Sequence, residues 1–357
     1  MSLRLNEKEN ASRRNGASGE LHMKTVKIAG TGSYLPARVV TNDEIAAQIE
    51  SSHEWIFSHT GIESRHVAAP EESAASMSAE ASRRALEAAG ARPEEIGLII
   101  LGTTTPDYVG CPSTACIVQE ALGCKNAAAF DLSAACSGFV YGLEMARCYL
   151  LCHPGMKALV IGTEVLSRSL NWRDRSNAML FGDGAGAAVL ELCEAPDSRL
   201  AGGLLGADGS GSSYIVKESA GKSARTSDPV HEFVDTENVQ YLTMDGHAVF
   251  AFAVRKLDEV VRQLCANAGI EPESLDWIFA HQANMRIIEA TARRLKLPLE
   301  KFYMFLSTVG NTSSASIPLC LDKAVREGTL KPGTRLALAG FGSGLTWAGA
   351  LMEWPYL

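Results

Sequence analysis

The sequence lacks any apolar run long enough to cross a bilayer, and it shows no signal-peptide pattern. It also lacks an excess of positive charge, because 33 Lys and Arg stand against 41 Asp and Glu, for a formal net charge of −8. These absences argue against a membrane protein and against a general nucleic-acid-binding protein. We therefore predict a cytoplasmic protein with neither a membrane nor a nucleic acid as its partner.

Metal, redox and dinucleotide motifs are missing as well. The nine cysteines are odd in number, and the closest pairs, Cys111/Cys116 and Cys148/Cys152, do not have the CxxC spacing of zinc or redox sites. The glycine-rich run 181–190 lacks the strand-to-helix context of a dinucleotide fingerprint. We predict no metal, no structural disulfide and no cofactor, and we interpret the glycines as sites where backbones approach closely.

The composition and the pattern of apolar residues predict an α/β protein. Of 357 residues, 46% are hydrophobic and 21% are charged, as in ordinary globular chains long enough for a substantial core. An alanine-rich helix is predicted at 77–89, and continuous apolar runs at 96–101 and 158–162 indicate strands covered on both faces. Helices that alternate with buried strands favour largely parallel sheets.

The domain organisation is predicted from shifts in composition. Residues 1–22 are polar and show no apolar period, so we expect a disordered leader, with Met23 as a natural start. Residues 198–240 are rich in Gly, Ser and Asp and are the expected connector. This gives an N-terminal half, 23–197, and a C-terminal half, 198–357.

The second half repeats features of the first in the same order. Residues 89–96 recur as 268–275, residues 158–162 as 336–340, and residues 181–184 as 341–344. On this alignment Phe130 matches Phe305, and Cys136 matches Asn311. We predict two pseudo-symmetric halves whose equivalent turns meet at a shared interface, where ligands often bind.

Cys136 lies where a predicted strand, 127–132, turns into a helix, with Ser133 available as the helix cap. The positive end of a helix dipole stabilises a thiolate, so the pKa of Cys136 is expected below its free value of about 8.5. The alternative is a small buried residue, which most intracellular cysteines are.

A histidine and an asparagine are the candidate partners of this thiol. His281 ends the predicted strand 275–280, at the edge where the repeat places Cys136 and Asn311. A lone histidine at a strand end is more often structural than catalytic. A thiol, an imidazole and an amide that converge nevertheless suit acyl transfer through a covalent thioester.

With these residues assembled, the chain from about residue 24 to its end closely resembles the 3-oxoacyl-[acyl-carrier-protein] synthase III family. The motifs that carry the resemblance are GTGSYLP (30–36), EWI (54–56), TGI (60–62), AACSGF (134–139), FGDGAG (181–186), HQANMR (281–286) and GNTSSAS (310–316). The resemblance implies the thiolase fold, two similar halves in five αβαβα layers, and a homodimer. It also implies decarboxylative condensation of an acyl-CoA primer with malonyl-acyl carrier protein.

The resemblance assigns roles to individual residues. It makes Cys136 the acyl-accepting nucleophile, His281 and Asn311 its catalytic partners, and the backbone N–H groups of Cys136 and Ser343 the oxyanion hole. It places coenzyme A against Trp55, Arg175 and His59, and it places the carrier protein on Gln282, Ala283, Asn284, Met285 and Arg286.

Three departures from the family pattern bear on substrate binding. His59 replaces the arginine of many members, which puts one CoA contact in doubt. Ser343 interrupts a usual run of glycines, so its side chain needs room. Cys111 aligns with a bulky phenylalanine that shapes the acyl pocket of some members, so longer or branched primers are plausible.

Other functions stay open at this point. A condensing enzyme of the same fold that makes a polyketide starter or a long-chain β-keto product would keep the same three residues. A degradative thiolase requires a second catalytic cysteine near the C-terminus, but the last cysteine of this sequence is Cys320, in a predicted helix. A cysteine thioester hydrolase and a non-catalytic interaction protein fit less well.

Overall fold

The computed structural model describes residues 24–194, 199–217 and 241–355. The predicted leader 1–22 and the boundary between residues 197 and 198 lie outside the described residues. Within the described ranges, no helix combines the length and the apolar character that a membrane span requires.

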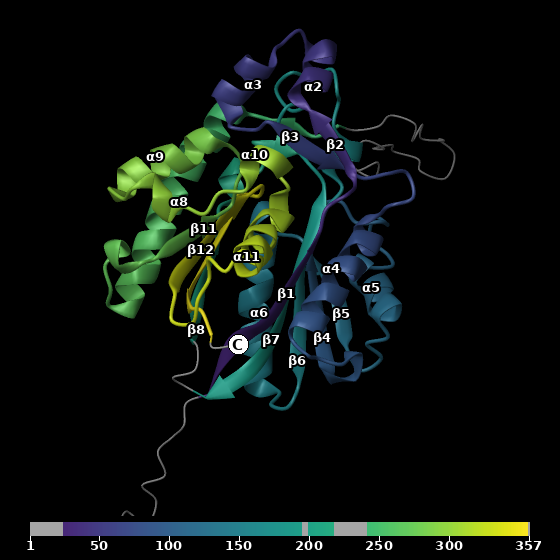
Figure 1. The fold of residues 1–357 in the computed structure, drawn as a ribbon, viewed down its shortest axis with the longest axis vertical. Coiled ribbons are helices and arrows are strands. Elements are labelled where there is room, and N and C mark those ends of the chain that lie inside the picture. The colour runs from purple at the N-terminus through teal and green to yellow at the C-terminus, as the bar shows by residue number, and fades with distance from the viewer. Residues whose placement is uncertain (1–23, 195–198, 218–240, 356–357) are drawn as a thin grey trace, which may run out of the picture.

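The first sheet has five strands, and it is built by the N-terminal half (Figure 1). Their order is β1 (Lys24–Tyr34), β7 (Gly184–Glu194), β6 (Lys157–Glu164), β4 (Ile96–Gly102) and β5 (Ala128–Leu132). Strand β4 pairs in parallel with β5 and β6, whereas β7 runs antiparallel to β1 and β6. Every residue of β4 is buried, which confirms the prediction of a strand covered on both faces.

The second sheet repeats this plan with β11 (Trp277–Ala280), β12 (Arg335–Gly342), β13 (Thr346–Glu353) and β8 (Arg199–Ala207). Phe302 adds a parallel bridge to Ile278 at the β11 edge. Strand β8 falls inside the predicted connector 198–240, so that prediction is wrong for its residues. The glycines that indicated a loop serve packing instead: a Cβ at Gly206 would lie 2.4 Å from the Trp347 ring.

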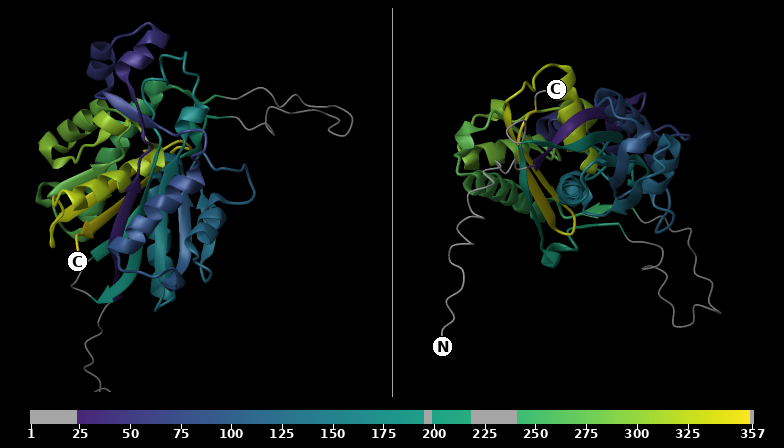
Figure 2. Two further views of the ribbon diagram at one scale, coloured as in Figure 1. Left: turned by 45° about the vertical axis from the view of Figure 1, so that its right-hand side comes forward. Right: turned by 90° about the horizontal axis from the view of Figure 1, so that it is seen from below.

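Helices form three layers around the two sheets (Figures 1 and 2). Helices α4 (Ala74–Ala88) and α5 (Thr114–Leu122) cover the outer face of the first sheet, and α8 (Gly246–Ala268) and α9 (Met285–Leu295) lie on the outer side of the second. Helices α6 (Gly138–Cys152) and α11 (Ser316–Arg326) lie between the sheets. The layer order αβαβα confirms the predicted fold class.

The remaining elements are short. At one end of the molecule, β2 (Arg38–Thr41) and β3 (Ser64–Val67) form an antiparallel pair, and α2 (Asn42–Ile49) and α3 (His53–Thr60) lie between them in the chain. Thr41 and Glu44 form a capping box that starts α2. The others are α10 (Leu306–Val309), β9 (Ile215–Val216), β10 (Thr243–Met244) and the 3₁₀ turns η1 (Pro93–Glu95), η2 (Ala135–Ser137), η3 (Leu166–Ser169), η4 (Gly209–Gly211), η5 (Pro272–Ser274), η6 (Leu299–Lys301) and η7 (Ser313–Ala315).

The central helices join the two halves into one core. Leu143 and Leu150 of α6 belong to the same buried cluster as Ile317 and Leu321 of α11. Burying one such side chain contributes roughly 1.5–3 kcal/mol, so this layer stabilises the contact between the halves.

The repeat is present, but its register differs from the prediction near the site. Turns η2 and η7 each begin with a residue in left-handed conformation, Ala135 (φ 47°) and Ser313 (φ 48°), and each leads directly into a central helix. The structural equivalent of Cys136 is therefore Ser314, not Asn311. The short helix α10, which follows Phe305 in the second half only, shifts the alignment between the strand and the turn.

Candidate active site

Cys136 lies in the 3₁₀ turn η2, and α6 begins only at Gly138. Ser133 is exposed and does not cap a helix, so the predicted cap is wrong. The turn is held instead by Ser137, whose hydroxyl donates to the Ala134 carbonyl at 2.7 Å. Gly138 allows the turn to pack closely on β4, because a Cβ there would lie 3.3 Å from the Gly102 Cα.

The C-terminal end of β12 runs directly against Cys136. A Cβ on Gly342 would lie 2.7 Å from the Cys136 backbone nitrogen, so only glycine fits without movement. The next residue, Ser343, turns its hydroxyl away to donate to the Ile215 carbonyl at 2.7 Å. This hydrogen bond accounts for the room that the Ser343 side chain needs. It also fixes the backbone segment whose N–H was predicted to form part of an oxyanion hole.

His281 follows β11, and its backbone N–H donates to the Ala339 carbonyl at 2.8 Å. Its ring is 1% exposed and meets the Phe341 ring edge-on at 5.0 Å between centroids. Nδ1 lies 2.8 Å from the Ser316 hydroxyl, whereas the buried Nε2 has no hydrogen-bond partner among the described residues. Burial lowers the pKa of His281 to about 3, so the imidazole is neutral near neutral pH.

Asn311 is held through its backbone by the segment that precedes β7. Its N–H donates to the Leu180 carbonyl at 2.8 Å, and its own carbonyl accepts from the Gly182 N–H at 3.0 Å. The side-chain Oδ1 accepts from the Ser313 N–H at 2.9 Å. Because Oδ1 is engaged in this way, the orientation of the amide is fixed, and Nδ2 is left as a donor for a ligand.

These contacts bring the three predicted catalytic residues into one centre. The Cys136 turn packs on β12, and Phe341 of β12 contacts the His281 ring. Ser316, which holds His281, starts the helix that follows the Asn311 turn. The sequence predicted that these three residues converge. It also predicted that Cys136 and Asn311 are equivalent positions of the repeat, and the structure corrects that equivalence.

The expected low pKa of Cys136 is wrong. Burial, the largest influence, and the negative charge of Glu164 together raise the pKa of the thiol to about 12. The Ser313 hydroxyl and the backbone N–H of Cys136 itself act in the opposite direction. The sequence pattern indicated a helix start but gave no measure of how deeply the side chain lies in the centre.

Sequence reasoning missed three residues around this centre: Ser313, Ser316 and Glu164. The two serines follow Asn311 in the GNTSSAS motif, and this proximity was the available signal. Glu164 is fully buried at the end of β6. The available signal for Glu164 was its position shortly after the apolar run 158–162. A carboxylate buried at such a position needs polar partners around it.

The three residues predicted to hold coenzyme A lie together at α3. The rings of Trp55 and His59 stack at 4.0 Å, and the Arg175 guanidinium lies 3.9 Å from the Trp55 ring centre. His59 Nδ1 is 2.7 Å from the Trp55 carbonyl oxygen. An aromatic ring beside a guanidinium suits a flat base and its phosphates.

The segment 282–286 divides into buried and exposed residues. Gln282 is only 2% exposed, because its amide donates to the Tyr303 carbonyl at 2.6 Å and accepts from the Phe305 N–H at 2.8 Å. Gln282 therefore does not face the surface, and the prediction that it contacts the carrier protein is wrong. Ala283 and Met285 are partly exposed, as their burial pattern shows.

Two side chains at the start of α9 connect this segment to α3. Asn284 caps α9 by accepting from the Arg286 N–H at 2.9 Å, and its Nδ2 donates to the His59 carbonyl at 3.1 Å. The exposed Arg286 side chain donates to the Ser58 carbonyl at 3.1 Å. The predicted carrier-protein surface is thus continuous with the predicted CoA site.

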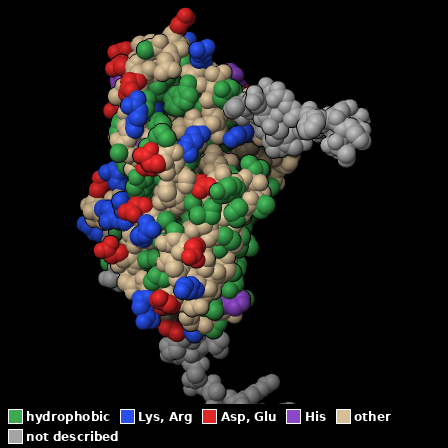
Figure 3. All heavy atoms as spheres, turned by 90° about the vertical axis from the view of Figure 1, so that its right-hand side faces the viewer, with side chains coloured by type: hydrophobic (Ala, Val, Ile, Leu, Met, Phe, Trp, Pro, Cys, Tyr) green, Lys and Arg blue, Asp and Glu red, His purple; other side chains and the backbone are tan. Residues whose placement is uncertain are grey.

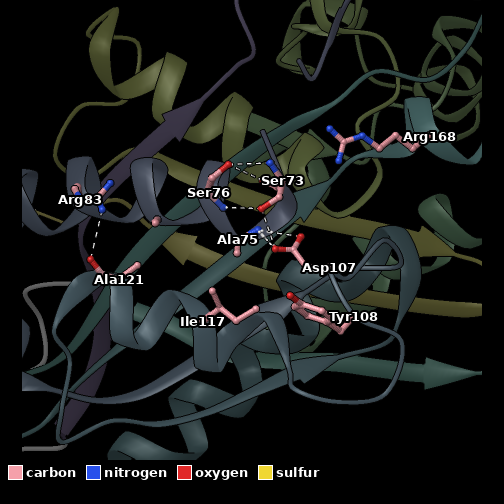
Figure 4. Close-up of a pocket in the computed structure, with 10 residues that line it drawn as sticks. Ser73, Ala75, Ser76, Arg83, Asp107, Tyr108, Ile117, Ala121 and Arg168 are labelled. Atoms are coloured by element: carbon pink, nitrogen blue, oxygen red, sulfur yellow. Dashed lines mark hydrogen bonds between the residues drawn. The ribbon is translucent and has the colours of Figure 1, made fainter. Parts of the chain in front are cut away.

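Cys111 is exposed in the segment between β4 and α5, where Tyr108 and the 88% exposed Val109 also lie. A cavity of about 680 Å³ beside Tyr108 lies between α4 and α5 (Figure 4). Its Asp107 carboxylate already accepts from the Ser73 hydroxyl at 2.8 Å. Neither Cys136 nor His281 lines this cavity, so it is separate from the centre described above.

Among the described residues, no group of three or more His, Cys, Asp or Glu side chains is arranged to hold a metal ion.

Comparisons with known proteins agree on one family. The family model of 3-oxoacyl-[acyl-carrier-protein] synthase III matches residues 130–209, and the model of its C-terminal part matches residues 265–354. The beta-ketoacyl-[acyl-carrier-protein] synthase III of Caldanaerobacter subterraneus is 45% identical over 327 residues, which are 92% of this chain and 97% of that protein.

Solved structures give the same result. The crystal structure of 3-oxoacyl-[acyl-carrier-protein] synthase III from Aquifex aeolicus superposes with a TM-score of 0.84 at 40% identity, covering 92% of this chain and 100% of that chain. A priming β-ketosynthase from a polyketide biosynthetic pathway superposes with a TM-score of 0.85 at 37% identity, covering 93% and 96%.

Proposed function

This chain belongs to the 3-oxoacyl-[acyl-carrier-protein] synthase III family, the initiating condensing enzymes of type II fatty-acid synthesis, and we propose that Cys136, His281 and Asn311 carry out its reaction. The reaction joins an acyl-CoA primer to malonyl-acyl carrier protein and releases CO2 and CoA. The observation that carries this proposal is the buried, neutral His281, whose unpaired Nε2 shares one centre with the Cys136 and Asn311 turns.

The first step is transfer of the acyl group to Cys136. Because burial raises the pKa of this thiol, a base must take its proton as the sulfur attacks the thioester carbonyl. His281 is that base, and the proton leaves with the CoA sulfur. The Ser316 hydroxyl can either donate to Nδ1 or accept from it, so it supports both tautomers of the ring.

The second step is decarboxylation of the malonyl thioester. As CO2 leaves, the electron pair of the broken bond forms an enolate, and negative charge builds on the thioester oxygen. Asn311 Nδ2 donates to this oxygen, and so does His281 Nε2–H in the tautomer that accepts from Ser316 at Nδ1. Such donors are most effective in a buried centre, where the local dielectric constant is low.

The enolate carbon then attacks the acyl group on Cys136. The backbone N–H groups of Cys136 and Ser343 stabilise the oxyanion that forms, and the carbon–sulfur bond breaks. The products are 3-oxoacyl-carrier protein and the Cys136 thiolate, which takes up a proton. No metal or cofactor takes part in any step that we propose.

Coenzyme A binds at α3 in this proposal. The adenine stacks on the Trp55 ring, and the Arg175 guanidinium, now on that ring, moves to the far side of the base. His59 already stacks on Trp55 and stabilises the position of the indole.

The carrier protein docks on the exposed residues at the start of α9, chiefly Arg286. An exposed arginine beside the CoA site suits an acidic partner, since charge pairing speeds association. Ala283, Asn284 and Met285 complete this surface.

Reversing the charge of Arg286 (Arg286→Glu) is expected to raise the KM for malonyl-acyl carrier protein about tenfold, because docking loses its main charge contact. The KM for acetyl-CoA should stay unchanged in steady-state assays of the condensation. Arg92→Glu, a charge reversal at another exposed arginine, which lies just before β4, is the matched control. A rise in both KM values would show that Arg286 acts through its contact with Ser58 on α3.

The protein acts as a homodimer in this proposal. Strand β5 is the edge of the first sheet, and Phe130 on it is exposed, as are Tyr108 and Val109 nearby in the preceding segment. Figure 3 shows hydrophobic side chains gathered on this side of the molecule. A second copy that covers these residues would bring the partner's Cys111 segment toward the acyl pocket, where a small residue leaves room for longer or branched primers.

The wild-type protein tests the proposal directly. Incubation with acetyl-, butyryl- and branched acyl-CoAs should add one acyl group to Cys136, as intact-mass and peptide mass spectrometry would show. Malonyl-acyl carrier protein should then give CO2 and 3-oxoacyl-carrier protein. Release of free acid alone would favour a thioester hydrolase, and a folded protein that accepts no acyl group would refute the proposal.

Primer choice separates fatty-acid synthesis from a specialised pathway. A priming β-ketosynthase from a polyketide pathway is similar to this chain in structure, so the choice of primer is the property to measure. Preference for acetyl or short branched primers supports the role in fatty-acid synthesis.

A further inference from the structure

Glu164 is a fully buried carboxylate that the proposed reaction does not use. It lies at the end of β6 and accepts hydrogen bonds from five side-chain hydroxyls and one backbone N–H. Burial raises the pKa of this carboxyl group, and the hydrogen bonds from Thr105, Thr104 and Ser313 act against that rise. So many donors around one group favour its ionised form.

The two oxygens of Glu164 serve different halves of the molecule. Oε2 accepts from the hydroxyls of Thr103, Thr104 and Thr105, at 3.4, 2.9 and 2.7 Å, in the segment that follows β4. Oε1 accepts from the hydroxyls of Ser313 and Ser314, at 3.0 and 3.2 Å, in turn η7. The backbone N–H of Thr104 donates to both. One side chain therefore joins the N-terminal half to the turn that follows Asn311.

Ser313 connects Glu164 to both Asn311 and Cys136. Its hydroxyl donates to Glu164, and its backbone N–H donates to Asn311 Oδ1. The same hydroxyl is a hydrogen-bonding group for the Cys136 sulfur. Any shift of Ser313 would therefore move the amide proposed to hold the enolate and would change the surroundings of the thiol.

Few titratable groups face this cluster among the described residues. Besides Glu164 and Cys136 they are His281, which is neutral, and Lys217, which follows β9. Burial lowers the pKa of Lys217, and Glu164 acts in the opposite direction. The Lys217 amine donates to the Ser169 hydroxyl at 2.8 Å. Glu164 is thus the one carboxyl group among these side chains.

We propose that Glu164 is a positioning residue for the acyl-transfer centre: its carboxylate fixes Ser313, and through Ser313 it fixes Asn311. This inference rests on the proposed function of Cys136 and Asn311.

The test compares Glu164→Gln with Ser313→Ala. Glu164→Gln removes the charge but keeps the shape, so Cys136 should react with iodoacetamide at pH 8 about tenfold faster, as for a thiol pKa lower by about one unit. Ser313→Ala keeps the charge, so its alkylation rate should stay close to that of the wild-type protein. A mere opening of the site would speed both variants.

Condensation provides the second measurement. The Gln side chain has only one acceptor oxygen, so the hydroxyls of one half of the molecule lose their hydrogen-bond acceptor. We therefore expect kcat with malonyl-acyl carrier protein to fall about tenfold, while the KM for acetyl-CoA changes little. Asp322→Asn is the matched control, since Asp322 is a buried carboxylate of α11 that accepts from the hydroxyls of Thr31 and Ser33 on β1.

Three outcomes decide the question. Faster alkylation in Glu164→Gln alone, together with condensation that is slower in Glu164→Gln than in Asp322→Asn, supports the proposal. Alkylation or condensation rates in Glu164→Gln equal to those of the wild-type protein and of Asp322→Asn would overturn it. Alkylation of Cys136 by iodoacetamide needs no acyl-CoA. If the wild-type protein accepts no acyl group, the proposed function is refuted, but the alkylation rates of the variants can still be compared.

Discussion

Replacing Cys136 by alanine is expected to abolish the acyl-enzyme and to lower condensation by about 10⁴-fold or more, because no other described cysteine lies at this centre. Intact-mass spectrometry after incubation with acetyl-CoA should show only unmodified protein. Release of CO2 from malonyl-acyl carrier protein should continue, since His281 and Asn311 remain to stabilise the enolate. Continued decarboxylation would distinguish loss of the nucleophile from loss of the fold.

Cys320→Ala is the matched control for this experiment. Cys320 is buried in α11, and burial also raises the pKa of its thiol, so the substitution removes a comparable group elsewhere. Acylation of this variant should match the wild-type protein. An acyl group that still attaches to Cys136→Ala would mean that another nucleophile carries the substrate, and the mechanism would be wrong.

The raised pKa of Cys136 has a consequence for pH dependence. Between pH 6 and pH 9 the free thiol stays protonated, so its reaction with alkylating reagents should rise steadily with pH and show no plateau. Acyl transfer from acyl-CoA depends on His281 as base, and burial holds the pKa of this imidazole near 3. Acyl transfer should therefore not show the loss near pH 6.5 that an ordinary histidine would give.

The αβαβα layers could be predicted because strong local patterns agreed with the global fold. Strand β4 is a continuous apolar run, and such a run is stable only when both faces are covered. The repeated segments required two similar halves. Strand β8 was missed because its glycines, which indicate a loop in isolation, allow the Trp347 ring to pack on the strand. That requirement comes from a residue far along the chain.

The three central residues of the site were predicted, but their supporting contacts were not. Cys136, His281 and Asn311 each carry a recognisable local motif, whereas Glu164 acts through hydroxyls from two distant segments. The pKa of Cys136 was misjudged for a related reason. A helix dipole can be read from sequence, but desolvation depends on everything that packs around the sulfur. The exact equivalence of Cys136 and Ser314 likewise needed backbone angles.

Replacing Asn311 by alanine is expected to leave acylation of Cys136 intact and to slow decarboxylation by about 10²–10³-fold. Asn311 Nδ2 is one of two side-chain donors to the enolate, and loss of one such donor costs about 3 kcal/mol of barrier. Acylation needs only Cys136, its base and the backbone donors, so it should proceed at the wild-type rate. Mass spectrometry measures the first step, and CO2 release from malonyl-acyl carrier protein measures the second.

The control for this variant is Asn177→Ala, which removes another buried asparagine. The Asn177 amide donates to Asp174 and to the Leu242 carbonyl, so its loss tests stability without touching the enolate. Loss of acylation in Asn311→Ala but not in Asn177→Ala would show that Asn311 acts in the first step. Because Asn311 Oδ1 also holds the Ser313 N–H, that result would mean that its main role is to keep the turn beside Cys136 in place.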